Sequence, residues 1–218
     1  MTFLLSEESH GLSYRNILMT VASTILRRVN GRGPGAVFTA QDFFDFGSRD
    51  AVDQALARLT RSGRIRRIDR GVYDLPRTHP KIGPMWPSAY AVAQAVAKQT
   101  DSHLQVSGAA AANALGLSTQ VPAKVEYLTD GPSRSVHIGK LLVSLKHAGR
   151  VDMLLPQTRA GMAIVALRHL GRNATSEAVL QQLAATLDRA DKQKLSRVRL
   201  RLPGWLGLAV NKVIGSAE

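Results

Sequence analysis

One segment, residues 48–76, constrains the fold of this chain most, because a helical pattern there passes directly into a short arginine-rich hairpin. Apolar residues recur at three- and four-residue steps, which predicts a helix that begins at Ser48 and ends at Gly63. Two short strands and a tight turn are predicted to follow. Six arginines fall within the thirteen residues that end at Arg70, opposed by one carboxylate, Asp69. A helix followed by a basic hairpin is typical of the recognition helix and wing of a DNA-binding domain.

The predicted helix has two different faces. At 100° per residue, one face gathers Val52, Ala55, Leu56 and Leu59, which we expect to be buried. The opposite face is polar and includes Gln54, whose amide can bond adenine with two hydrogen bonds in the major groove. Basic residues at the end of the helix and in the hairpin are expected to reach backbone phosphates.

The residues before this segment predict a small domain around it. Ser13 is expected to cap a first helix that continues to Val29. A short strand at 37–38 and a brief second helix between Thr39 and Gly47 follow. Together with the hairpin, this pattern predicts a winged helix-turn-helix DNA-binding domain over 13–76.

The composition indicates a phosphate-bearing partner. The chain of 218 residues has an apolar fraction of 44%, which is ordinary for a globular protein, but its formal net charge is +13. Such an excess of basic residues is most often found in proteins that bind nucleic acid, and next most often in proteins that bind anionic membrane surfaces. There is no apolar run of about 18 residues and no signal-peptide pattern, and cysteine is absent. These features favour a cytoplasmic protein that does not enter a membrane.

The remainder of the chain predicts a second, mixed domain. Residues 77–87 contain three prolines, and we expect an irregular linker there. Residues 88–218 then predict a mainly helical α+β domain, so the fold class of the whole chain is α+β. The expected helices and strands are helices after Ser88 and Ser107, strands at 125–129 and within 138–146, helices at 159–170 and 176–187, a helix or strand near 190–202, and a helix at 205–214.

No catalytic constellation is found in the sequence. The six histidines have no metal-ligand spacing, and no nucleophile or phosphate-binding motif occurs, so we expect no enzymatic activity, no metal and no cofactor. A second basic cluster extends from Arg189 to Arg201. It is either a solvated face or a second surface for phosphates or an acidic partner. A nucleic-acid-processing enzyme and a ligand-sensing regulator remain as alternative functions.

Four motifs occur in the order found in a known family. They are AVFTAQDF at 36–43, VDQALARLTRSGRIRRIDRGVYDLP at 52–76, SGAAAANALGLSTQVP at 107–122 and VEYLTDGPSR at 125–134. With these motifs the chain resembles the AbiE-type antitoxins (the AbiEi family) of type IV abortive-infection toxin–antitoxin systems. The resemblance covers residues 15–150.

This resemblance implies an antitoxin that represses its own operon as part of a phage-defence system. The winged helix of such a protein would bind repeated sites in double-stranded DNA of its own promoter. The C-terminal domain, of antitoxin type, would oppose a cognate nucleotidyltransferase-like toxin, with direct contact left open. The residues that match the DNA-binding helix and wing are Ser48, Arg49, Gln54, Arg58, Arg61, Arg64, Arg66, Arg67 and Arg70.

Overall fold

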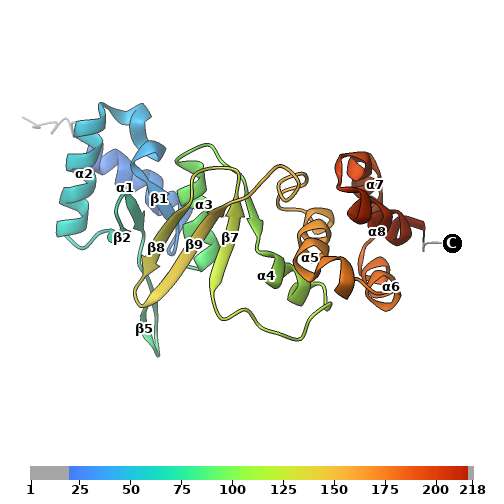
Figure 1. The fold of residues 1–218 in the computed structure, drawn as a ribbon. Coiled ribbons are helices and arrows are strands. Elements are labelled where there is room, and N and C mark those ends of the chain that lie inside the picture. Colours follow the sequence, from blue (N-terminus) through green and yellow to red (C-terminus); the bar gives the residue numbers. More distant parts are fainter. Residues whose placement is uncertain (1–19, 216–218) are drawn as a thin grey trace, which may run out of the picture.

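The computed structural model describes residues 20–215, and it has an elongated α+β fold (Figure 1). The predicted cap at Ser13 lies outside the described residues. Three hydrophobic clusters follow one another along the chain, in an N-terminal unit, a central sheet with one helix against it, and a C-terminal group of helices. The α+β class predicted from the sequence is therefore confirmed.

The N-terminal unit combines three helical elements with a small sheet. In this sheet β3 lies between β1 and β2 and is antiparallel to both. The predicted buried face of α2 is confirmed, because Val52 and Leu56 have no exposed surface and pack with Phe38 and Phe43. The elements are α1 (Val21–Arg32), β1 (Val37–Thr39), the 3₁₀ helix η1 (Ala40–Phe46), α2 (Arg49–Arg61), β2 (Arg66–Asp69) and β3 (Val72–Asp74).

The ends of α2 follow from local chemistry. The hydroxyl of Ser48 accepts a hydrogen bond from the backbone N–H of Ala51 at 3.3 Å, which satisfies a donor of the first turn. Gly63 follows the helix with φ of 69°, a left-handed conformation that glycine adopts without steric cost. Both predicted boundaries of this helix are confirmed.

Residues 77–87 differ from the prediction. The expected irregular backbone is wrong, because β4 (Arg77–His79) and β5 (Gly83–Met85) form an antiparallel hairpin in which Thr78 is opposite Pro84. Proline is tolerated there because a two-stranded ribbon consists of edge strands only. In Figure 1 this hairpin extends away from the rest of the molecule, beyond the C-terminal end of α2.

The central unit is a four-stranded sheet in the order β6-β7-β9-β8, with β7 and β9 parallel and the other pairs antiparallel. Helix α3 packs on one face, where its Val92 and Val96 meet Val143 and Leu145 of β9. Val72 of β3 is buried in this same cluster, so the N-terminal unit shares a core with the central sheet. The elements are α3 (Ala89–Lys98), β6 (Leu104–Val106), β7 (Val125–Thr129), β8 (Arg134–Ile138) and β9 (Leu141–His147), whereas α4 (Gly108–Ala114), which lies between β6 and β7 in the chain, packs in the C-terminal helical cluster.

The C-terminal unit is entirely helical within the described residues. Helices α4 and α5 pack closely, and Gly108 allows this because a Cβ there would lie 2.5 Å from the Cβ of His169. The segment near 190–202, which the sequence left as helix or strand, is a helix followed by one 3₁₀ turn. None of the helices within 20–215 is long and apolar enough to cross a membrane. The elements are α5 (Arg159–Ala174), α6 (Glu177–Thr186), α7 (Arg189–Val198), η2 (Arg199–Arg201) and α8 (Gly204–Gly215).

Candidate nucleic-acid interface

The outer face of α2 presents the side chains that the sequence predicted for it. Gln54, Arg58 and Arg61 are exposed on the helix, and Ser48 and Arg49 are exposed at its N-terminal end. The apolar residues of α2 hold this face outward because they are fixed in the N-terminal core. The helix is therefore positioned by packing, and its polar face is free to meet a partner.

Three hairpin arginines extend the basic surface beyond the helix. Arg64, Arg67 and Arg70 are exposed, and Arg67 and Arg70 line a polar pocket of about 400 Å³ together with Arg49. Three cations from the first turn of α2 and from the β2–β3 hairpin thus meet at one cleft, which Asp53 also lines. Because the three cations outnumber this single carboxylate, the cleft attracts anionic groups.

Arg66 is placed differently from the other predicted residues. Its guanidinium donates to both carboxylate oxygens of Asp74, at 3.0 and 2.5 Å, and to the carbonyl of Met85 at 2.8 Å. It also lies 4.1 Å from the ring centroid of Trp86. Asp74 has no exposed surface. The guanidinium of Arg66 is therefore occupied by partners within the protein, and the predicted contact with a phosphate would require these bonds to break.

The turn of the β2–β3 hairpin is also held, because it lies against the central unit. The carboxylate of Asp69 accepts from the backbone N–H of His137 at 2.8 Å, and Arg134 donates to the carbonyl of Arg70, also at 2.8 Å. Burial alone would raise the pKa of Asp69, but the N–H donors of His137 and Arg70 and nearby positive charge lower it overall. Sequence reasoning missed Arg134, because the residue it anchors lies 64 positions away along the chain.

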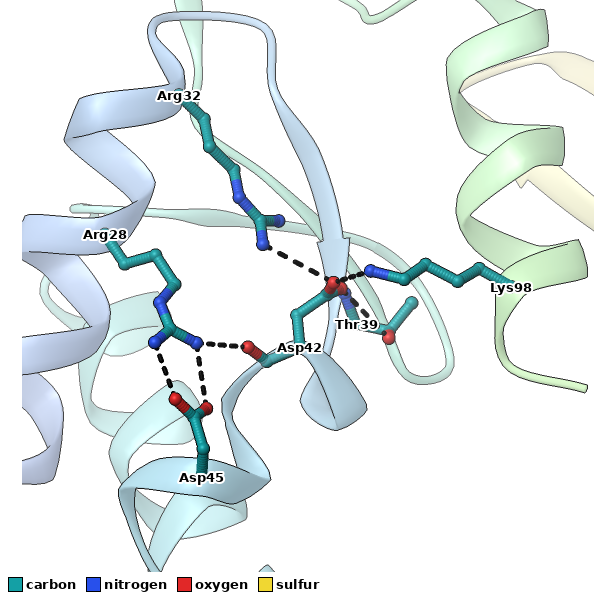
Figure 2. A network of polar contacts seen from close by, with 6 residues as sticks. All are labelled: Arg28, Arg32, Thr39, Asp42, Asp45 and Lys98. Atoms are coloured by element: carbon teal, nitrogen blue, oxygen red, sulfur yellow. Dashed lines mark hydrogen bonds and ion pairs between the residues drawn. The ribbon is translucent and has the colours of Figure 1, made fainter. Parts of the chain in front are cut away.

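Asp42 joins the N-terminal unit to α3 on the other side (Figure 2). Its side chain accepts from the backbone N–H of Thr39 at 2.8 Å and pairs with Lys98 at 2.5 Å and Arg32 at 3.5 Å. Burial opposes ionisation of this carboxyl, but the bonds from Lys98 and Thr39 and the charge of Arg32 outweigh it and lower the pKa. Asp42 is therefore ionised at neutral pH and neutralised by the protein itself.

The remaining carboxylates of the N-terminal unit, Asp69 aside, fall into two groups. Asp45 and Asp74 each accept two hydrogen bonds from one arginine side chain. Asp50 and Asp53 are exposed on α2, and Asp53 lies 3.9 Å from an arginine of the same helix. Arginine pairing therefore neutralises Asp74 in the interior and Asp45 at the surface, while the arginines around α2 stay exposed.

A second concavity lies between the N-terminal unit and α3. Its volume is about 570 Å³, and Arg32, Asp42, Lys98 and His103 are among the residues that line it. Within residues 20–215, no three or more histidine, aspartate or glutamate side chains are grouped so that they could hold a metal ion. The charged groups in this groove mostly pair with one another, which suits a structural junction.

Comparisons with known proteins identify a family. A model of DUF6088, described as a family of unknown function, matches residues 24–195. A crystal structure of the RV2827C protein from Mycobacterium tuberculosis is 18% identical with a TM-score of 0.42, and the match covers 90% of this chain and 77% of that one. A comparison with curated proteins finds no match. Because the family model spans most of its length, the chain belongs to the DUF6088 family.

Proposed function

We propose that the chain is a DNA-binding regulator whose N-terminal unit acts as a winged helix. Helix α2 would enter the major groove, and the arginines of the β2–β3 hairpin would lie along the adjacent backbone. The observation that carries this proposal is the asymmetry of charge. Six exposed arginines surround the outer face of α2, against the two exposed carboxylates of Asp50 and Asp53.

The chemistry of this face suits duplex DNA better than a small anion. The arginines are spread from the first turn of α2 to the β2–β3 turn, so they match a line of phosphates and not a single one. Gln54 lies among them on the exposed side of the helix, where its amide can reach the edge of a base. Arg66 is left out of the contacting set and positions the hairpin through Asp74.

We also propose an antitoxin role, supported by the resemblance to the AbiE-type antitoxins. The protein would repress its own operon in the cytoplasm by binding repeated promoter sites. It would counteract a nucleotidyltransferase-like toxin through the central and C-terminal units, without catalysis of its own. Co-expression with the product of an adjacent nucleotidyltransferase-like gene tests this role, and undiminished growth arrest would refute it.

The DNA proposal is tested by the double variant Arg58→Ala/Arg61→Ala in fluorescence anisotropy with the upstream DNA of its own gene. Each lost phosphate contact should reduce the slope of log affinity against log salt concentration by about 0.9, so we expect a slope shallower by about 1.8. We assign the 189–201 cluster as a solvated face, so the variant Arg189→Ala/Arg197→Ala, which removes the same charge from α7, should bind like the wild type. Equal binding by both double variants would refute the assignment of α2.

Base reading by Gln54 has a separate signature. Gln54→Ala should relax preference at one base pair, at a cost of about 1–3 kcal/mol on the preferred sequence, and leave the salt slope unchanged. A panel of single-base substitutions in the binding site measures this change. A loss that is uniform over all sequences would contradict the role of Gln54 in specificity.

The groove beside α3 favours one second candidate, a ligand-sensing regulator. A small molecule bound among Arg32, Asp42 and Lys98 would lie at the junction of the N-terminal unit and the central sheet. Thermal-shift screening of anionic metabolites tests this candidate. A ligand that stabilises the wild type but not Lys98→Met would support it.

A further inference from the structure

We propose that the β4–β5 hairpin, residues 77–85 and hereafter the arm, is a second DNA-binding element that contacts duplex flanking the site held by α2. The positive side chains of the arm would lie on phosphates, and its apolar tip would enter the minor groove. This inference rests on the proposed DNA-binding function and names a further part of its interface.

The first observation is that most of the arm, its tip above all, is solvent-exposed. The tip residues Pro80, Lys81 and Ile82 are all exposed, and Ile82 exposes 70% of its surface. Figure 1 shows the hairpin extending past the body of the molecule on the side where α2 ends. An isolated two-stranded hairpin with so little packing adds little to stability by itself. Its tip is therefore available for contact with a partner.

The second observation is the sign of its charge. Arg77 and Lys81 are exposed, and the sequence has no carboxylate between Asp74 and Asp101. Within residues 20–215, neither Arg77 nor Lys81 takes part in an ion pair. Lys81 beside the exposed Ile82, with a second unneutralised cation, Arg77, at the base of the arm, complements a polyanion whose stacked bases can take an apolar side chain between them.

The third observation is that the base of the arm is fixed relative to α2. Arg66 of β2 donates to the carbonyl of Met85 at 2.8 Å and stacks on Trp86, while its other bonds go to buried Asp74. On the far side Trp86 lies against Gly139, where an added Cβ would be 3.1 Å from the indole. The base of the arm is therefore held in a fixed position relative to β2. Binding of a partner would cost little conformational entropy for ordering the arm.

The fourth observation concerns the β2–β3 turn, which would normally be the tip of a wing. Asp69 and Arg70 bind His137 and Arg134 of β8, so this turn lies against the central unit and does not project. The arm is the element that projects in its place. Proteins that bend or grip DNA commonly insert an apolar side chain from a basic arm or strand into the minor groove. A duplex is thus favoured over a protein partner.

The test uses the full chain on its upstream DNA, with Arg77→Ala/Lys81→Ala and Ile82→Ala as variants. Hydroxyl-radical footprinting should show a protected patch next to the site held by α2, and each variant should lose this patch. The double variant should also have a salt slope shallower by about 1.8. The matched control Arg189→Ala/Arg197→Ala should keep both properties. Thermal unfolding should be unchanged, because all three side chains are exposed.

The outcomes separate the arm from the proposed function. If the wild type does not bind DNA, or Arg58→Ala/Arg61→Ala binds equally well, the proposed function fails and the arm inference fails with it. If those α2 variants weaken binding but the arm variants keep the flanking patch and the salt slope, only the arm inference is overturned. It is likewise overturned if the arm variants change self-association in light scattering while the DNA footprint is retained.

Discussion

Replacing Arg66 by alanine should destabilise the fold without removing a DNA contact. The guanidinium is about a fifth exposed, but its partner Asp74 is fully buried, so alanine leaves a carboxylate without a counter-charge in the interior. The substitution also removes the hydrogen bond to Met85 and the stacking on Trp86.

The magnitude follows from the geometry. Removing one partner of a buried ion pair costs about 3–5 kcal/mol, and the partial exposure of Arg66 places this case near the lower end. For a chain of this length, about 3 kcal/mol corresponds to a decrease in Tm of roughly 6–12 °C. Arg66→Lys should recover part of the loss, since lysine keeps the charge but cannot make the two parallel bonds.

The assay is thermal unfolding by circular dichroism at neutral pH and fixed protein concentration, with Arg67→Ala as the matched control. Arg67 is the exposed neighbour, and its guanidinium has a single weak contact, 3.4 Å to the carbonyl of Asp69. We expect Arg67→Ala to unfold like the wild type but to bind DNA less tightly. If Arg66→Ala unfolded within 2 °C of the wild type, the reasoning from the buried pair would be wrong.

Two further predictions concern Asp42 and Gly161. The pKa of Asp42 is lower in the folded protein than in the unfolded chain. The contribution of Asp42 to the free energy of unfolding is therefore present above the unfolded pKa of about 3.9, and it is lost as the pH falls through the folded pKa. The difference in unfolding free energy between the wild type and Asp42→Asn should thus be constant from pH 7 to 5 and shrink below about pH 4; a difference that grows in acid would contradict this. Gly161→Ala should lower the free energy of unfolding by about 3 kcal/mol or more, because the new Cβ would lie 1.9 Å from the carbonyl oxygen of Leu155. Gly149→Ala is the matched control: its Cβ would meet nothing within 4 Å, so a denaturant titration should show no change in stability.

The elements that the sequence predicted well are those whose signals are local. The cap at Ser48, the glycine at 63 and the apolar spacing of α2 lie within one helix, and each has the predicted structure. The helices that begin after Ser88 and Ser107 were found for the same reason, since both serine hydroxyls accept a bond from the first turn. Local chemistry decides where such helices begin and end.

Some missed features depend on contacts between distant segments, and others on local signals that the prediction did not use. Strand β6 pairs with β7 on the other side of α4, so no local pattern marked it, whereas β8 pairs with the following strand β9 in a hairpin whose turn contains Gly139. Residues 77–87 were predicted as an irregular linker because they contain three prolines, yet most of them form the arm. Nor could composition distinguish Arg66 from Arg67. Neighbouring residues of one strand point to opposite faces, and only the fold shows which face is covered.

The junction between the units decides how the proposed functions can be connected. Val72 shares the core of the central sheet, Asp42 pairs with Lys98 on α3, Asp69 and Arg70 bind β8, and Gln41 and Gly71 bind Gln99 after α3, so several separate contacts join the N-terminal unit to the centre. A hinge within residues 77–87 could move α2 only if all of them were broken. Coupling between sites needs an element with two arrangements, and this junction has the packing of a single one. A partner bound to the C-terminal helices would therefore affect DNA binding by occupying space beside the duplex, and not by rotating α2.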